Sequence, residues 1–459
     1  MPKLPTVNVN EISSFDEAKQ VISTLLDTVD LQQKEILALK EEIARLKKYP
    51  RKPQFNKQSH HVSAKDMEKD SKPWQKGTRG KIVVDHHIQL PELKQCACGS
   101  TEFKTITTTT KIVQGVSITR NNTAYHGRRK QCISCGKTYN TPIPDDVKGI
   151  SFDRTTQSLV SFLKFHCRFT QPLLYRFFHE FGISISYGEL QYMLQKNSQK
   201  LQEAYLYLRK QGLYKSTYLH ADATGAKRRQ RATSQIEQQF LHIAGNMQFS
   251  LFKITKKYNS SIMAALLGKH GRKKIYLSDD ASPNGKRLRI IRKQLCLIHE
   301  VRHYRSLSPR YKIQRKKQQE VVQQWQQFYQ LAKEYRHDPV QEKKDTIRNL
   351  FDTITRQTTG YEPLDRQLAL TRMKRKKLLL FLAYPIVPIQ NNQAERDLRE
   401  FVILRKISGE TKSQAGDRSI ERHLSVIQTV KKQGLPIFAT LHGLLTHTLP
   451  LSVLTANIS

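Results

Sequence analysis

Residues 216–222 read STYLHAD, a short β-prone run that opens the part of the chain that decides the fold. Four further short β-prone runs follow, at residues 239–244, 249–255, 274–278 and about 295–298. Gly245 and Asn246 form a turn dipeptide between the second and third runs, and an apolar helical segment at 261–267 precedes the fourth. A helix follows the fifth run. This order predicts an α/β domain whose first three strands are antiparallel.

Carboxylates occur at the ends of two strands that this order of elements makes neighbours. Three antiparallel strands, then helix, strand, helix and strand, is the order of the ribonuclease H-like sheet, in which the first and fourth strands are central neighbours. Asp222 ends the first strand and Asp279 follows the fourth, so their side chains are expected to converge. Glu395, in NNQAERDLR (391–399), adds a third oxygen ligand. Such a set suits two Mg²⁺ (or Mn²⁺) ions and phosphoryl transfer on a nucleic acid.

Each of these residues also has a structural interpretation. An Asp at the end of a β-run is commonly a turn residue or a helix cap. Asn followed three residues later by Glu is a helix N-terminus signature, and it fits Asn392 and Glu395. Asp280 replaces Asp279 as the second acid if the strand ends one residue later; we favour Asp279.

The composition points to a polyanionic partner. The 459 residues include 78 Lys and Arg against 39 Asp and Glu, a formal net charge of +39. A charge of this size favours nucleic acid over a membrane. No run of about 18 apolar residues occurs, and the N-terminus lacks the apolar centre of a secretory signal. We therefore expect a protein of the reducing cytosol (cytoplasmic), where cysteines are more often metal ligands than disulfides.

A heptad repeat occupies the N-terminal segment. Ile22, Val29, Ile36 and Ile43 recur every seven residues, with Leu at most of the interleaved d positions. β-Branched residues at a with Leu at d favour a parallel dimeric coiled coil; a single amphipathic helix packed on its own domain is the alternative. From residue 50 to 80 the chain is polar, basic and interrupted by prolines, as in a flexible linker.

Two cysteine pairs follow the linker. Cys96 with Cys98 (CACG) and Cys132 with Cys135 (CISCG) supply four thiolates, which suit a tetrahedral, structural Zn²⁺. The C-x-C spacing is tighter than usual, so the first half of this site is either distorted or completed by a histidine such as His87. Unliganded thiols are the alternative interpretation.

Helical periodicity resumes between about residues 155 and 206. Gly182 interrupts it, and a second helix is expected from Tyr187. This pattern fits a DNA-reading helix-turn-helix and fits a helical connector between domains equally well. Farther along, residues 308–382 exceed what the sheet needs and are predicted to form a helical insertion with a basic run at 372–377.

Several motifs together resemble the insertion sequence 66 family of DDE transposases. They are HADAT at 220–224, Asp279 after IYLS, Cys296-x-x-His299-x-x-Arg302, and NNQAERDLR followed by Leu404-Arg405-Lys406. The likeness covers most of the chain and also its order: coiled coil, zinc module, helical segment, ribonuclease H-like catalytic domain. It implies that Asp222, Asp279 and Glu395 form the catalytic triad. The family usually carries Asp-Glu-Thr where this chain has Asp222-Ala223-Thr224, which removes a neighbouring acid but leaves the triad intact.

The expected fold is a multidomain α+β chain with a ribonuclease H-like catalytic domain. Its divisions are 1–49 (helix or coiled coil), 50–80 (linker), 81–145 (zinc-binding module), 146–210 (helical), 211–410 (catalytic, with the insertion at 308–382) and 411–459 (C-terminal helices). Side chains expected to contact DNA are Arg128, Arg129, Lys227, Arg228, Arg229, Asn392, Arg396 and Arg399. Salt bridges or helix capping are the alternative roles for these residues.

The resemblance implies a transposase that cleaves the ends of a mobile element and joins them to target DNA. The expected partners are DNA, a second copy of the chain in a dimer or higher oligomer, and accessory proteins of the same element. Two alternatives stay open. One is a non-catalytic DNA-binding regulator derived from a transposase, and the other is a ribonuclease H-like nuclease that only hydrolyses strands.

Overall fold

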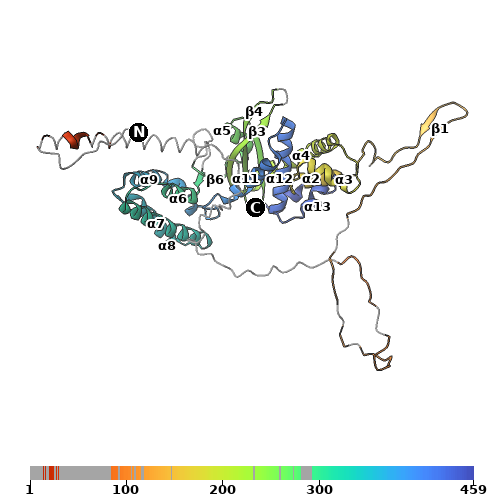
Figure 1. Ribbon diagram of the computed structural model, residues 1–459, viewed down its shortest axis with the longest axis horizontal. Helices are drawn as coiled ribbons and strands as arrows, with labels where there is room; N and C mark the ends of the chain where they lie inside the picture. Colours follow the sequence, from red (N-terminus) through yellow and green to blue (C-terminus); the bar gives the residue numbers. More distant parts are fainter. Residues whose placement is uncertain are drawn as a thin grey trace. The chain divides into compact units, whose positions relative to one another are not determined.

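Figure 1 shows the computed structural model of the chain. It describes residues 14, 16, 20–24, 27, 29, 84–90, 94–104, 106–107, 110–114, 118–145, 147–230, 233–257, 260–271, 273–280 and 292–458. The chain divides into two units, Met1–Gly115 and Val116–Ser459. The linker predicted at 50–80 lies outside the described residues, as does most of the heptad repeat, of which Ile22 and Val29 are described and are about half exposed.

A five-stranded mixed sheet forms the centre of the described part of the second unit. Its strands are β3 (Tyr218–Arg229), β4 (Ile236–Gly245), β5 (Ser250–Thr255), β6 (Ile275–Ser278) and β7 (Arg292–Leu295). Their spatial order is β5-β4-β3-β6-β7. β3, β4 and β5 pair antiparallel, whereas β6 runs parallel to β3 and β7 parallel to β6. The predicted α+β architecture with three antiparallel strands first is confirmed.

Two strand boundaries differ from the sequence prediction. β3 does not end at Asp222 but continues to Arg229, because β4 pairs with it along that whole length. The pairing with β6 stops at His220, so Asp222 lies just beyond the end of that parallel ladder.

The fifth strand also lies earlier than predicted, since β7 ends at Leu295 and α6 (Leu297–Arg305) begins two residues later. A short apolar run such as 295–298 fits a strand end and a buried helix start equally well.

The predicted turn between β4 and β5 is present at Gly245 and Asn246. A Cβ at Gly245 would lie 2.3 Å from the Phe249 carbonyl oxygen, so only glycine fits there. The Asn246 side-chain oxygen accepts hydrogen bonds from the backbone N–H groups of Gln248 (2.8 Å) and Phe249 (3.2 Å), which closes the turn.

Three helices precede the sheet: α2 (Arg154–Phe165), α3 (Gln171–Glu180) and α4 (Tyr187–Lys215). Gly182, with φ +70°, lies in the turn between α3 and α4, as the sequence predicts. Ser186 and Glu189 form a capping box at the start of α4. The two helices and the glycine turn between them are present, and α4 continues to Lys215, past the predicted helical stretch, because its buried face packs on α12 and α2.

The sheet is covered by helices that come late in the chain (Figure 1). They are α11 (Asn392–Ser408) and α12 (Gln414–Lys432), whereas α13 (Ile437–Leu445) packs on α2, α4 and α12, and α5 (Ser260–Gly271) connects β5 to β6. α11 packs on β3 and β4, and α12 packs on β5 and α4. A short 3-10 helix, η3 (Leu451–Thr455), packs on α4.

The predicted helical insertion is present between α6 and α11. It consists of α7 (Lys312–His337), α8 (Gln341–Arg356), α9 (Glu362–Met373), α10 (Arg375–Leu378) and the 3-10 turn η2 (Leu380–Leu382). These helices enclose their own apolar core, in which Trp325, Phe328 and Phe351 are fully buried. No helix in the described part of the chain is long and apolar enough to cross a membrane.

Candidate active site

Asp222 and Asp279 come from the two neighbouring strands at the sheet centre. The β3–β6 ladder ends with His220 opposite Leu277, and Asp279 directly follows β6. Burial raises the pKa of Asp222 to about 6, and although a hydrogen bond from the Ala223 N–H opposes this shift, the charges of Asp279 and Glu395 add to it. Like charges shift a pKa in this way only at short range. The three acids therefore share one region of the molecule.

Glu395 reaches this region from the first turn of α11. Its Oε1 lies 3.5 Å from the Nε2 of His299 and 3.6 Å from Nη1 of Arg302, both on α6. The Arg302 guanidinium and the His299 ring nitrogen are themselves 3.0 Å apart. Burial and the Arg302 charge lower the pKa of His299, which keeps this imidazole neutral at pH 7. In this arrangement Arg302 is the cation that faces Glu395.

Asn391 fixes the start of α11 against the sheet. It occupies the N-cap position, but its side chain makes no capping hydrogen bond. Its Nδ2 donates instead to the carbonyl of Ala221 (3.2 Å), and its backbone N–H donates to the Sγ of Cys296 (3.2 Å). Its Oδ1 is buried without a hydrogen-bond partner in the described structure. Asn391 therefore joins α11 to β3 and to the start of α6, and its side chain does not cap the helix.

Asp279 and Asp280 have different surroundings. The charge of Asp279 acts on both Asp222 and His299, so Asp279 faces the acids and α6. Asp280 is exposed and forms an ion pair with Lys374 (2.6 Å), which is also 3.2 Å from Glu300. Burial acts to raise the pKa of Asp280, but this ion pair outweighs it and the pKa falls. These contacts support our preference for Asp279.

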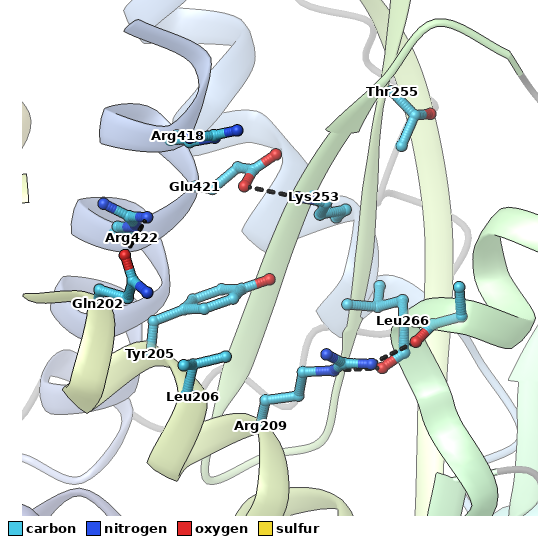
Figure 2. Close-up of a pocket in the computed structure, with 11 residues that line it drawn as sticks. Gln202, Tyr205, Leu206, Arg209, Lys253, Thr255, Leu266, Arg418, Glu421 and Arg422 are labelled. Atoms are coloured by element: carbon cyan, nitrogen blue, oxygen red, sulfur yellow. Dashed lines mark hydrogen bonds and ion pairs between the residues drawn. The ribbon is translucent and has the colours of Figure 1, made fainter. Parts of the chain in front are cut away.

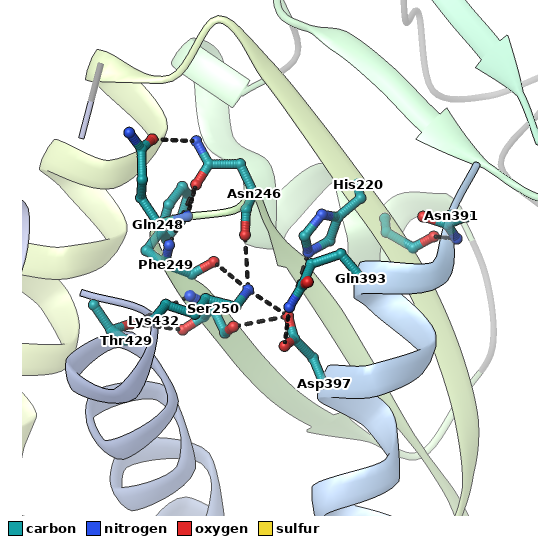
Figure 3. Close-up of polar contacts among 11 residues, drawn as sticks. His220, Asn246, Gln248, Phe249, Ser250, Asn391, Gln393, Asp397, Thr429 and Lys432 are labelled. Atoms are coloured by element: carbon teal, nitrogen blue, oxygen red, sulfur yellow. Dashed lines mark hydrogen bonds and ion pairs between the residues drawn. The ribbon is translucent and has the colours of Figure 1, made fainter. Parts of the chain in front are cut away.

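A buried charged cluster that the sequence did not reveal lies around Asp397 (Figure 3). The Oδ2 of Asp397 accepts hydrogen bonds from Lys432 Nζ (2.6 Å) and Ser250 Oγ (2.8 Å) and lies 3.3 Å from the His220 Nε2. Gln393 donates to the other carboxylate oxygen (3.0 Å). Asp397 is two residues from Glu395 and His220 two residues from Asp222, so the cluster links the elements that carry two of the acids.

The ionic character of this cluster follows from its partners. Burial acts to raise the pKa of Asp397, but His220 and Lys432 outweigh burial and the pKa falls. Burial lowers the pKa of His220, so the imidazole is neutral and donates to Asp397 from Nε2. Lys432 also donates to the carbonyls of Asn246 (2.7 Å) and Phe249 (3.1 Å). All three donor positions of the ammonium are therefore used.

The residues predicted to contact DNA differ in exposure and in whether their side chains are already paired within the protein. Lys227, Arg396 and Arg399 are exposed, as are Arg128 and Arg129 in the second unit's hairpin. Arg228 is mostly buried and pairs with Asp417 and Glu237. Arg229 pairs with Glu410 (2.5 Å), and Asn392 donates to Gln390 (2.9 Å). The guanidinium of Arg228 is thus engaged within the protein, which matches the salt-bridge alternative for that residue.

The cysteine pairs lie in different units. Cys96 and Cys98 belong to the first unit, and Cys132 and Cys135 connect the hairpin strands β1 (Arg129–Gln131) and β2 (Thr138–Asn140) in the second. Backbone N–H contacts within each knuckle lower the pKa of Cys98 and of Cys132. Among the described residues, no group of three or more His, Cys, Asp or Glu is arranged to hold a metal ion. The four-cysteine zinc site stays a prediction.

A cavity of about 450 Å³ lies between α4, α5, β5 and α12 (Figure 2). Arg209, Arg418 and Arg422 line it together with Lys253, whose ammonium is 3.0 Å from Glu421. None of the three candidate acids lines it. The cavity is therefore separate from the candidate active site.

Comparison with known proteins gives two matches. The model of the family described as "Transposase IS66 family" matches residues 150–419, which is more than half of the chain and includes all three candidate acids. The uncharacterized protein y4jO of Sinorhizobium fredii (strain NBRC 101917 / NGR234) is 33% identical over 161 residues. This alignment covers 35% of the present chain and 49% of that protein, so it spans about half of the relative's length.

Proposed function

This chain belongs to the IS66 family of transposases, and from that premise we propose that it cleaves DNA at the ends of its mobile element and joins the freed ends to target DNA. The family match confirms the resemblance drawn from the motifs and supports a role in transposition. The strand order β5-β4-β3-β6-β7, with β6 parallel to a central β3, supports a ribonuclease H-like catalytic domain.

Asp222, Asp279 and Glu395 are the proposed catalytic acids. The observation that carries this proposal is electrostatic: burial raises the pKa of the partly buried Asp222 to about 6, and the charges of the other two carboxylates add to this shift. A buried carboxylate with two like-charged neighbours is unfavourable unless a cation joins them. The donor set consists of hard oxygens, the ligands that Mg²⁺ and Mn²⁺ prefer.

The acids therefore fit two divalent ions, which when bound would activate the attacking oxygen and stabilise the leaving oxygen of an in-line displacement. The described side chains are not yet arranged as ligands of one ion. Glu395 faces His299 and Arg302 instead. We infer that Glu395 must turn from Arg302 toward Asp222 when metal binds, while Asn391 holds the backbone of α11 in place.

The exposed cations near the acids are proposed to bind the DNA backbone. Arg396 and Arg399 project from α11, and Lys227 lies farther along β3. Arg302 is half exposed and would be released toward a phosphate when Glu395 leaves it. Phosphate contacts of this kind position the duplex without reading its sequence.

We also propose roles for the other regions of the chain. Helices α3 and α4 would read the element ends, the N-terminal heptads would pair protomers so that two active sites act on two ends, and the cysteine pairs would hold structural zinc. Accessory proteins of the same element would complete the assembly. We propose these regions with the boundaries expected from the sequence, although the division between the two units, after Gly115, falls inside the proposed zinc-binding module at 81–145.

Incubating the purified full-length protein with Mg²⁺ and labelled element-end DNA tests the proposal. Strand cleavage followed by joining supports the transposase. Cleavage without joining would identify a nuclease, and binding without either would identify a regulator. Glu395→Gln is expected to keep DNA binding and to lose cleavage; full cleavage by this variant would remove Glu395 from the triad.

A further inference from the structure

A second cavity, of about 650 Å³, opens at the end of α11 that is remote from the candidate acids. Its walls come from the junction of α2 and α3, from β3 and β4, and from the segment between α11 and α12. A cavity of this volume takes a ligand the size of a single nucleotide rather than a duplex.

The walls of this cavity carry an excess of positive charge. Its cationic side chains are Lys164, Lys227, Arg405 and Lys412. In the described structure none of these four forms an ion pair with a carboxylate. Two carboxylates also line the cavity, but Glu410 is paired with Arg229 and Asp417 with Arg228. Arg405 donates to the Gly225 carbonyl and Lys164 to Ser408, so these two cations lack a counter-ion but each has a hydrogen-bond acceptor.

Lys164 is the most deeply placed of these cations. Its ammonium donates to the Ser408 Oγ (3.1 Å), which uses one of its three donor positions. Burial lowers the pKa of this lysine to about 8, with no neighbouring carboxylate to oppose the shift. A half-buried ammonium without a counter-ion is unfavourable, and a bound anion would supply that counter-ion.

The same cavity has an apolar wall beside the cations. Phe165, Leu194, Ala226, Ile254 and Leu404 contribute to it. The first residues of α3 and the N-cap of α12 also line the cavity, but they offer few free N–H groups, because Pro172 has none and the Thr170 and Ser413 side chains already accept from Leu173 and Gly416. Cations and an apolar wall in one cavity match the two halves of a nucleotide, the phosphate and the nucleoside.

The cavity lies along the elements that carry the acids. Ala226 lines it and is four residues from Asp222 on β3, on the same strand face and about 13 Å away at the strand rise. Arg405 is ten residues from Glu395 on α11, which is about 15 Å along the helix. A strand that leaves the acids along β3 and α11 therefore reaches the cavity within a few nucleotides.

We propose that this cavity binds one unpaired nucleotide of the DNA strand that leaves the active site, with its phosphate on Lys164 and its nucleoside against the apolar wall. The proposal rests on the proposed function for the origin of that strand. The cavity would bind a phosphodiester group and a single base, and this binding requires no cleavage.

The test is binding of the full-length protein, without Mg²⁺, to fluorescein-labelled ten-nucleotide oligothymidylate and to a duplex of the same length. Lys164→Met is expected to weaken single-strand binding about tenfold, the loss of one charge-assisted hydrogen bond, and to change duplex binding less than about twofold. Lys227→Gln alters an exposed rim residue and is expected to weaken the single-strand complex severalfold. Lys210→Met, an exposed α4 variant outside the cavity, is the matched control and should change neither.

Two results would overturn the proposal: unchanged single-strand affinity in Lys164→Met, or equal losses for single strand and duplex in Lys164→Met. Thymidine 5′-phosphate as competitor distinguishes the sources of the nucleotide, because equal affinity for it and for the oligonucleotide would identify a free nucleotide as the ligand. Lys164-dependent binding without any cleavage of element ends would reject the transposase proposal alone. Normal cleavage with Lys164-independent binding would reject the cavity proposal alone.

Discussion

The side-chain amide of Asn391 donates a 3.2 Å hydrogen bond to the carbonyl of Ala221, the residue that precedes Asp222. This contact joins the N-cap of α11 to β3, and so it sets the position of Glu395 relative to Asp222. The same asparagine is fastened to α6 through the Sγ of Cys296. One buried side chain thus relates the elements that carry two of the proposed acids.

Asn391→Ala is therefore expected to reduce cleavage at least tenfold, while the protein loses only about 1–2 kcal/mol of stability. The measurements are single-turnover cleavage and denaturant unfolding. Asn197→Ala is the matched control, because Asn197 is also buried and its amide also donates to a carbonyl, of Gln157, but on α4 away from the acids. Equal cleavage losses in the two variants would show that Asn391 acts only through stability.

Asp222 is expected to make stability depend on pH. Its pKa is about 6 in the folded protein against 3.8 for the free side chain, because of burial and the charges of Asp279 and Glu395. The native state therefore binds more protons than the unfolded state between these pH values, and the free energy of unfolding falls as pH rises through that window.

Asp222→Asn removes this penalty and is expected to stabilise the protein by on the order of 2 kcal/mol at pH 8 and by little at pH 4. Urea unfolding at both pH values provides the measurement. Asp345→Asn, a change at an exposed α8 carboxylate, should alter stability by less than about 0.5 kcal/mol. A variant that is less stable than the wild type at pH 8 would contradict the proposed crowding of carboxylates.

Arg302 is expected to compete with divalent metal for Glu395. Its Nη1 lies 3.6 Å from the Glu395 Oε1, so metal binding must displace an existing cation. Arg302→Gln should lower the midpoint of a Mn²⁺ titration severalfold, as followed by electron paramagnetic resonance. Arg305→Gln, one turn later on α6 and exposed, is the control. A higher midpoint in Arg302→Gln would mean that Arg302 instead helps to hold Glu395 in its metal-binding position.

The sequence predicted those parts of the fold that local patterns determine. Alternating and apolar runs located β3 to β6, Gly182 located the turn between α3 and α4, and surplus length located the insertion. The length of β3 was missed because its last four residues, AKRR at 226–229, are basic and do not alternate. These residues form a strand because β4 pairs with them and because Asp417, distant in the chain, pairs with Arg228.

The candidate site was predictable only in part. The order of strands predicted that Asp222 and Asp279 lie close together, and both follow the end of the parallel β3–β6 ladder, although β3 itself continues to Arg229. The contact of Asn391 with Ala221 and the cluster around Asp397 depend on side chains that are far apart in sequence. Lys432 is the clearest case: a lysine in the last turn of a helix reads as solvent-exposed, yet it is buried against Asp397.

Lys432→Met is accordingly expected to destabilise the protein by about 3–5 kcal/mol, because it leaves the Asp397 charge buried without its cation. Lys432→Met combined with Asp397→Asn should recover part of this loss, since the charge that needed a partner is gone. Denaturant unfolding of the single and double variants measures the coupling. If the double variant loses more free energy of unfolding than the two single variants lose together, the assignment of a charged pair is contradicted.

The last expectation concerns the edge of the sheet. β5 is an edge strand, and three α12 side chains one helical turn apart take the place of a neighbouring strand. The backbone N–H groups of Ile254, Phe252 and Ser250 donate to Glu421 (2.8 Å), Ser425 (2.9 Å) and Thr429 (3.2 Å). The acceptors on α12 are four residues apart, which is about 6 Å along a helix, and the N–H donors on β5 are two residues apart, which is about 6.7 Å along a strand. Because these two spacings are similar, three successive hydrogen bonds can form.

Ser425→Ala leaves the buried N–H of Phe252 without an acceptor, which is expected to cost about 1–3 kcal/mol. Amide hydrogen exchange should show faster exchange at Phe252 than in the wild type, and denaturant unfolding gives the free energy. Ser452→Ala, at an exposed serine, should stay within about 0.5 kcal/mol of the wild type. If the exchange rate at Phe252 is unchanged in Ser425→Ala, the hydrogen bond does not protect this N–H. Burial alone would then protect the β5 edge from solvent.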